Sequence, residues 1–150
     1  MTATSALVFE LSEFDSDPSG STTYVTLDIR AKVGGFAGAS ACVLAERDLV
    51  DFLNNLESLA KGAGGEAVLR GGWGSSEDIR VHAFPADERG HIRIRATLAE
   101  VPNHEYRCQL DSFFETEPQP TLRLVASLRS AIRARRTGEF PMFVKGGAAA

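Results

Sequence analysis

Residues 91–99, with the sequence HIRIRATLA, alternate between apolar and polar side chains at every step. The apolar members share one face: Ile92, Ile94, Ala96 and Leu98. The polar members share the other: His91, Arg93, Arg95 and Thr97. A period of two is typical of a β-strand with one face buried and the other in water. This stretch therefore predicts an antiparallel sheet that is covered on one side only.

Similar strand patterns lie on both sides of this stretch, at residues 6–11, 23–33, 39–45, 66–70, 78–84 and 105–114. The connections 85–90 and 101–104 are short, as antiparallel hairpins require. Residues 12–22, which are rich in Ser, Asp, Pro and Gly, predict a loop, and residues 115–120 (ETEPQP) predict a linker. The chain thus supplies enough strands for a whole sheet.

Two segments carry apolar residues at helical spacing, residues 46–61 and residues 121–136. Gly62 and the glycines after it are expected to end the first helix. Thr121 is expected to cap the second helix at its N-terminus. Each helix presents one apolar stripe, which predicts that both helices cover the dry face of the sheet.

The resulting order is three strands, a helix, four strands and a helix. It predicts an α+β fold in a single domain over residues 1–137. Its core is a twisted antiparallel sheet, free to curl into an open barrel or a sandwich, with two amphipathic helices. Residues 138–150 are expected to form an extended or loose C-terminal tail.

The composition is that of an ordinary soluble domain, with 150 residues, a net charge of −4 and 24% charged residues. No apolar run approaches the roughly 20 residues of a membrane helix. The first residues make a poor signal peptide, so we expect a cytoplasmic protein without a membrane partner. Cys42 and Cys108 both lie in predicted strands, where free cysteines are usually buried.

No motif for catalysis or metal binding is present. His82, His91 and His104 lack metal-ligand spacing, and no Gly-x-Ser-x-Gly turn occurs. The glycine-rich turns do not connect a strand to a helix, as a phosphate cradle would require. We therefore expect a protein that is not an enzyme, with no catalytic residue, no metal and no cofactor.

Two groups of charged residues are candidate binding surfaces. The first follows the polar positions of the strands: Arg30, Lys32, Arg80, His82, Arg93, Arg95 and Arg107. The second is an acidic patch: Asp15, Asp17, Glu46, Asp48 and Asp51. Arginine is common at interfaces and binds carboxylates in two-point contacts, although a solvated sheet face has the same pattern. We do not expect nucleic acid as the partner, because the net charge is negative and few aromatic residues share the basic face.

Several segments together resemble a known family. They are VGGFAG at 33–38, ACVL at 41–44, RDLVDFLNNLE at 47–57, EAVL at 66–69 and GHIRI at 90–94. This pattern resembles the WapI-type immunity proteins and related uncharacterised small bacterial proteins, over residues 23–132. The resemblance implies a bacterial protein that binds a secreted toxin domain and neutralises it. It carries over no catalytic residue.

Three hypotheses follow. The first is a non-enzymatic binding protein, a toxin-neutralising immunity protein that occludes its partner through the basic face or the acidic patch. The second is a module that binds a small ligand or an anion with the same Arg and His residues. The third is an oligomerisation or interaction domain without a ligand, in which the edge strand at 66–70 pairs in a homodimer.

Overall fold

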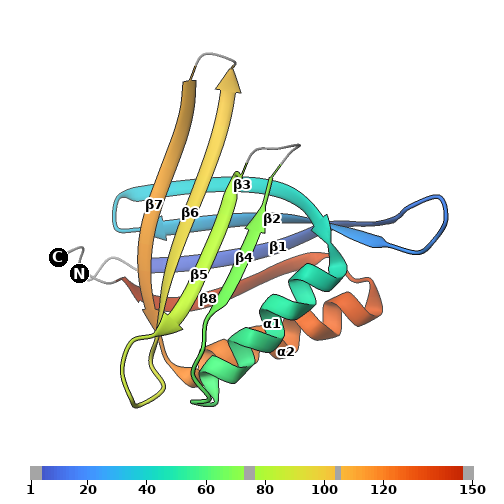
Figure 1. Cartoon of the computed structure of the whole chain (residues 1–150). Coiled ribbons are helices and arrows are strands. Elements are labelled where there is room, and N and C mark those ends of the chain that lie inside the picture. Colours follow the sequence, from blue (N-terminus) through green and yellow to red (C-terminus); the bar gives the residue numbers. More distant parts are fainter. Residues whose placement is uncertain (1–4, 73–76, 104–105, 147–150) are drawn as a thin grey trace.

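The computed structural model describes residues 5–72, 77–103 and 106–146, with side chains given for 5–72, 77–100 and 108–142. Within these residues, eight strands and two helices follow one another along the chain (Figure 1). The elements are β1 (Ser5–Ser16), β2 (Thr23–Val33), β3 (Phe36–Ala45), α1 (Glu46–Ala60), β4 (Ala67–Gly71), β5 (Ile79–Pro85), β6 (Ile92–Asn103), β7 (Tyr106–Thr116), α2 (Pro118–Ala134) and β8 (Gly138–Gly146).

The strands form two antiparallel sheets. Sheet A has the order β3-β2-β1-β8, and sheet B has the order β7-β6-β5-β4. The end of β8 also pairs with β7, through Phe114↔Gly146 and Glu115↔Lys145, and this pairing joins the two sheets. The predicted α+β class, with an antiparallel sheet and two helices in one domain, is confirmed, and the strands do not close into a barrel in the part described.

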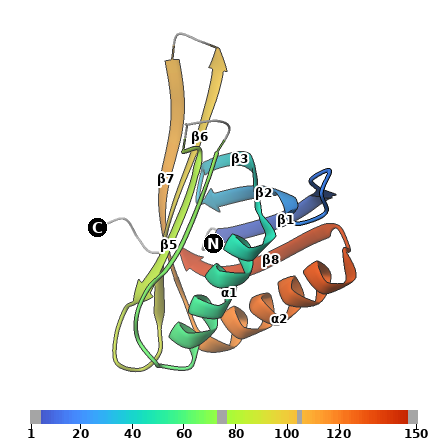
Figure 2. The ribbon, with the colours of Figure 1, turned by 45° about the vertical axis from the view of Figure 1, so that its right-hand side comes forward.

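The helices fill the angle between the two sheets. In the turned view, the strands of sheet A extend to one side of sheet B, and α1 and α2 lie next to each other below the strands of sheet A (Figure 2). The helix α1 buries the predicted stripe: Leu49, Phe52, Leu53, Leu56, Leu59 and Ala60. The helix α2 does the same with Leu124, Val125, Leu128, Ala131 and Ile132. Arg129 of α2 also hydrogen-bonds Glu57 and Asn54 of α1, which fixes the helix pair.

Strand β3 crosses the inner face of sheet B at very short range. The Ser40 hydroxyl donates to the carbonyl of Ala99 at 2.7 Å, and Val43 forms a bridge with Gly72. A Cβ atom on Gly71 would lie 2.4 Å from Cys42 Sγ. Glycine at position 71 therefore lets the two sheets approach each other.

The variant Gly71→Ala is expected to lose about 1–3 kcal/mol of unfolding free energy, because the added methyl group would clash with Cys42 in a packed core. The matched control is Gly35→Ala, where no heavy atom lies within 4 Å of the added Cβ. The control should stay within about 0.5 kcal/mol of the parent chain. Urea unfolding of both variants measures the difference, and equal losses would contradict this account.

The predicted domain boundary at residue 137 is wrong. Residues 138–146 are extended, but they form β8 inside sheet A rather than a tail outside the domain. Register pairs include Leu7↔Met142 and Phe9↔Phe140, and Met142 is only 1% exposed. Hydrophobic burial and a full strand partner therefore hold this segment in place. Residues 147–150 of the predicted tail lie outside the described part.

Smaller differences concern the ends of elements. The predicted linker at 115–120 is divided between the end of β7 and the start of α2, because proline fits the first turn of a helix. Thr121 is not the N-cap, and its hydroxyl donates to the carbonyl of Glu117 instead. Strand β1 also continues to Ser16, into the predicted loop.

The two cysteines differ in their surroundings. Cys42 is fully buried, as predicted, and burial raises the pKa of its thiol to about 12. Cys108 is exposed, contrary to the prediction for both residues. In Figure 1 the β6–β7 hairpin extends beyond the strands of sheet A, so the inward positions at its end have no opposing sheet to cover them. Alternation along a strand predicts the direction of a side chain but not whether anything packs against it.

Candidate functional site

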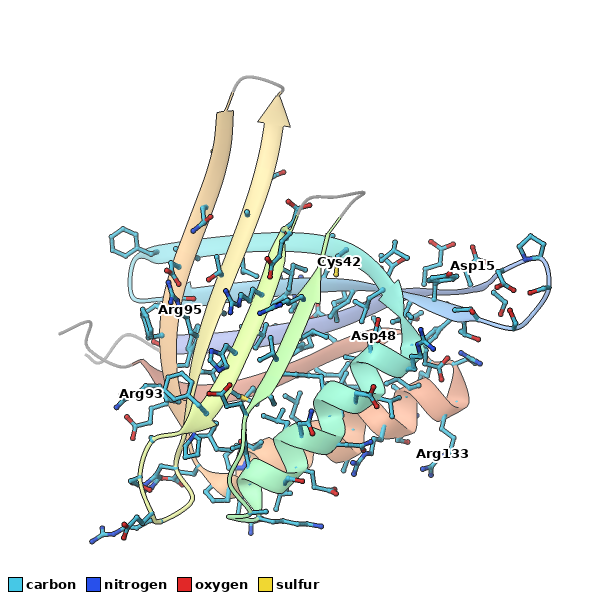
Figure 3. The ribbon with its side chains drawn as sticks, viewed as in Figure 1. Asp15, Cys42, Asp48, Arg93, Arg95 and Arg133 are labelled. Carbon is cyan, nitrogen blue, oxygen red and sulfur yellow. The ribbon has the colours of Figure 1, made fainter. Side chains whose placement is uncertain are left out.

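The predicted basic residues do not share one face. Arg30 and Lys32 lie on β2, on the outer side of sheet A. The others with described side chains lie on the outer side of sheet B: Arg80, His82, Arg93 and Arg95. Figure 3 shows Arg93 and Arg95 on sheet B, which lies in front of sheet A in this view. Because the two sheets pack through their inner sides, their outer sides point in different directions. The side chain of Arg107 lies outside the described part.

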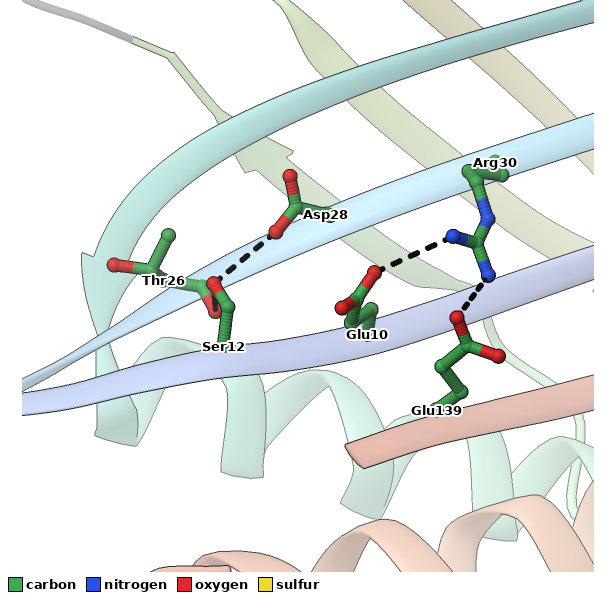
Figure 4. A network of polar contacts seen from close by, with 6 residues as sticks. All are labelled: Glu10, Ser12, Thr26, Asp28, Arg30 and Glu139. Carbon is green, nitrogen blue, oxygen red and sulfur yellow. Dashed lines mark hydrogen bonds and ion pairs between the residues drawn. The ribbon is translucent and has the colours of Figure 1, made fainter. Parts of the chain in front are cut away.

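Arg30 is held by carboxylates from two neighbouring strands. Its Nη1 lies 3.4 Å from Glu10 Oε2 on β1, and its Nη2 donates to Glu139 Oε1 on β8 at 2.6 Å (Figure 4). The hydrogen bond that Arg30 donates to Glu139 is the main cause that raises the pKa of Arg30. This guanidinium group joins three strands of sheet A, so its contacts are already filled within the chain.

Arg95 is also paired, but on sheet B and in a two-point geometry. Its Nε and Nη2 donate to the carboxylate of Asp111 at 3.0 and 2.7 Å. The guanidinium carbon lies 5.5 Å from the centre of the Phe113 ring, and Phe113 is 45% exposed. The fork of hydrogen bonds fixes Arg95 in one orientation and leaves an aromatic side chain open to solvent beside it.

The Arg95–Asp111 pair predicts an acid-dependent loss of stability. The hydrogen bond from Arg95 lowers the pKa of Asp111 below its usual value of 3.8. Because the pKa of Asp111 is lower in the folded state than in the unfolded state, the pair stabilises the protein fully above pH 3.8. This stabilisation is lost as the pH falls through the lowered pKa of the folded state. Both side chains are at least 32% exposed, so the contribution at neutral pH is expected to be at most about 1 kcal/mol.

Urea unfolding at neutral pH and below pH 3.8 measures this effect in Asp111→Asn. The difference from the parent chain should shrink on acidification. Asp51→Asn is the control, because Asp51 is exposed, lies beyond the first turn of α1 and has no ion pair in the part of the chain described. A constant difference for Asp111→Asn at both pH values would contradict the prediction.

A hollow of about 260 Å³ lies beside Arg95 on the outer side of sheet B. It is lined by polar side chains: Glu77, Arg80, His82, Arg95, Thr97 and Gln109. His82 Nε2 lies 3.3 Å from Glu66 Oε2, but the two are not aligned for a hydrogen bond. The ring of His82 packs against Phe84, with 5.1 Å between the ring centres. The hollow therefore gathers three of the predicted basic residues: Arg80, His82 and Arg95.

Two guanidinium groups on this face are unpaired. Arg80 and Arg93 are both exposed, and neither has an acceptor among the described residues. Arg80 lies in the lining of the hollow, and Arg93 lies further along β6, opposite Phe84 and Glu115 in the register. We call the outer surface of sheet B formed by Arg80, His82, Arg93, Arg95 and Phe113 the arginine face.

Part of the predicted acidic patch is used by the chain itself. Asp17 accepts hydrogen bonds from the Ser19 hydroxyl at 2.8 Å and from the amide and hydroxyl of Ser21 at 3.0 Å. These hydrogen bonds lower the pKa of Asp17, and the bond from the Ser19 hydroxyl has the largest effect. Asp17 therefore organises the turn between β1 and β2, and Glu46 is paired with Arg135.

Arg135 was not expected in this region from the sequence. It follows α2, with a left-handed backbone at φ 54°, binds Glu46 of α1 and lies 5.7 Å from the ring of Phe14 on β1. A basic side chain is thus inserted among the predicted acidic residues. Asp15, Asp48 and Asp51 remain exposed, and Figure 3 shows Asp15 and Asp48 far from Arg93 and Arg95 in that view.

Within the described ranges, no three His, Cys, Asp or Glu side chains are grouped so that they could hold a metal ion. His91 hydrogen-bonds Asp87 in the turn between β5 and β6, and His104 lies outside the described part. No described helix is both long and apolar enough to cross a membrane. The chain matches no protein-family model, no curated protein and no solved structure.

Proposed function

We propose that this protein is a non-enzymatic binding protein that holds a protein partner against the arginine face. The observation that carries the proposal is the pair of exposed guanidinium groups, Arg80 and Arg93, which have no acceptor among the described residues. Arginine and aromatic side chains are enriched at protein interfaces, and Phe113 adds an exposed ring to the same surface. The expected partner surface carries carboxylates that meet these two arginines.

The fixed orientation of Arg95 supports this choice of face. A side chain already held by Asp111 and stacked near Phe113 loses little freedom when a partner arrives. Arg80 and Arg93, in contrast, supply charge that is not neutralised within the chain. The combination of a preorganised centre and unpaired charges favours both affinity and fast association with an acidic partner.

The acidic patch is the weaker candidate. Asp17 is committed to its turn, and Glu46 is committed to Arg135. The three remaining carboxylates come from the β1–β2 hairpin and from α1, with the positive charge of Arg135 nearby. A basic partner would therefore meet a surface of mixed sign.

The biological role that we propose is a toxin-neutralising immunity protein. It rests on the resemblance carried by residues 33–57, 66–69 and 90–94. Its mechanism would be occlusion: the face covers the functional site of the toxin domain, and the buried charge pairs determine which toxin is recognised.

Affinity capture from the lysate and secretome of the source organism, followed by binding measurements with the purified partner, tests this proposal. The double variant Arg80→Glu/Arg93→Glu should weaken binding by about a hundredfold or more, because truncating buried charge pairs at interfaces costs several kcal/mol. The matched control is Asp48→Lys/Asp51→Lys, which reverses the same number of charges on α1 and should bind normally. Circular dichroism checks that both variants are folded.

Two outcomes would overturn the proposal. Loss of binding in the α1 variant with normal binding in the arginine-face variant would assign the function to the acidic patch. A captured partner that is a second copy of this chain would favour the oligomerisation hypothesis, since β4 lies at an edge of sheet B. The immunity role additionally requires that the protein suppress the activity of the captured domain in a purified mixture.

A further inference from the structure

We infer that the hollow beside Arg95 is a carboxylate-binding site. Its lining combines two guanidinium groups, an imidazole, a hydroxyl and a side-chain amide on adjacent strands. The guanidinium groups and the amide of Gln109 can donate hydrogen bonds to an oxygen ligand. The Thr97 hydroxyl already donates to Asp111 at 3.2 Å. The site is contained within one sheet, which positions its residues more rigidly than a loop would.

The register explains why these donors converge. His82 is directly opposite Arg95, and Arg80 is directly opposite Thr97. Arg80 and Arg95 are therefore diagonal neighbours across β5 and β6. Diagonal neighbours on one face of a sheet are within reach of long side chains. A ligand above this position can therefore contact both guanidinium groups together.

Several donor atoms in this group are unused. Arg95 binds Asp111 through Nε and Nη2, which leaves Nη1 without an acceptor in the described part of the chain. Arg80 has no acceptor at all among the same residues, whereas His82 Nε2 is buried beside the Glu66 carboxylate and is not counted among these donors. Unsatisfied donors that face one hollow are the feature of a ligand site rather than of a surface that is complete in itself.

The charges around the hollow favour a single negative charge. Arg70, which is directly opposite Arg80, lies 3.5 Å from Glu77, and Asp111 neutralises Arg95. Arg80 is thus the one guanidinium of these three that lacks a counter-charge in the described residues. Because Glu77 also lines the hollow, a dianion would meet more repulsion than a monoanionic carboxylate.

The size of the hollow agrees with a carboxylate on a short chain. The hollow of about 260 Å³ admits a group of several non-hydrogen atoms. An acidic side chain of a protein partner fits within it, and this choice of source rests on the proposed function. A free small carboxylic acid has the same chemistry and is the other source.

Titration of the full-length, ¹⁵N-labelled protein with sodium butyrate, a monoanionic carboxylate on a short chain, followed by NMR, tests the site without any partner. Ionic strength is held constant with sodium chloride. Saturable shifts are expected in the amide signals of Arg80, His82, Thr97 and Gln109. Arg80→Gln should weaken the affinity about tenfold or more, because a hydrogen bond to a charged group is lost. Arg93→Gln changes the same face outside the hollow and should bind as the parent chain does.

Three results would overturn the inference: shifts that do not saturate, shifts that sodium chloride alone reproduces, or unchanged affinity in Arg80→Gln. Tighter binding of inorganic phosphate than of butyrate would overturn the assignment to carboxylates. The failure of the site is separable from the failure of the proposed function. A protein partner that depends on Arg93 but not on Arg80 would retain the arginine face as an interface while removing the hollow from it. Butyrate binding with no protein partner would assign the hollow to a free acid.

Discussion

A chain that ends at residue 137 is expected to lose cooperative folding. This truncation removes β8, which pairs with β1 from Ser5 to Leu11 and whose last residues pair with β7 of sheet B. It also removes the buried side chain of Met142 and exposes a full edge of β1. Domains of this kind are stable by only about 5–15 kcal/mol, and the loss of a whole interior strand is expected to exceed that margin.

Urea unfolding followed by circular dichroism measures this effect. The parent chain should show one sigmoidal transition, whereas the truncated chain should change gradually, with a much smaller dependence on urea because little surface remains buried. A chain that ends at Gly146 is the length control, since it keeps all of β8 and should unfold like the parent. A cooperative transition with the same slope in the shorter chain would show that β8 is dispensable.

The sequence predicted most of this architecture because alternation and helical spacing are direct consequences of burial. In β6 every apolar position of residues 92–98 is buried, as its period of two required. The apolar stripe of α1 likewise faces the core. These patterns survive in the sequence because each strand or helix has one dry side, whatever its neighbours are.

Strand β8 was missed because it contains the two residues that usually exclude a strand. Gly138 begins it, and Pro141 lies in its middle. Proline is tolerated at strand edges, where its missing N–H removes no ladder bond. In the described residues β8 pairs with β7 only at its last two positions, so most of one side has no ladder partner. Proline is tolerated in β8 because of this missing ladder partner, which depends on how the sheets pack and is not encoded in the local sequence.

The candidate site could be predicted only in part for a similar reason. Alternation indicated that Arg30, Arg80 and Arg95 point outward, and they do. It could not indicate that Arg30 belongs to the other sheet, or that its partner Glu139 lies 109 positions away. Ion pairs over such separations are set by topology, so the sequence overestimated the number of free charges on the basic face.

The charges that remain unpaired after folding are the more useful guide to function. Surface pairs such as Arg95–Asp111 contribute little to stability, at most about 1 kcal/mol. They do fix the orientation of a side chain at a surface. On sheet B this leaves Arg80 and Arg93 as unpaired charges around a fixed Arg95. On the described part of the outer side of sheet A, by contrast, no arginine is unpaired, because Arg30 forms ion pairs with both Glu10 and Glu139.

The substitution Phe52→Ala is expected to cost about 3–5 kcal/mol of unfolding free energy. Phe52 is 1% exposed and belongs to the stripe by which α1 packs between α2 and the strands. Removing the ring deletes its buried area and leaves a cavity that neighbouring elements cannot fill, since both sheets and α2 are tied by their own contacts. For a domain of this length the loss corresponds to a fall of roughly 6–20 °C in the unfolding midpoint.

The matched control removes the same ring from the surface. Phe36 lies at the start of β3, just after the turn from β2, and is 74% exposed, so Phe36→Ala should change the unfolding free energy by no more than about 0.5 kcal/mol. Calorimetry and urea unfolding of both variants compare an identical chemical deletion in two environments. Equal effects would mean that α1 does not hold its apolar stripe against the two sheets. A large effect at Phe52 alone locates the common core of the domain in the angle between sheets A and B, where the helices lie. The arginine face lies on the other side of sheet B from this core, so charge reversals there should weaken partner binding without the stability loss expected of Phe52→Ala.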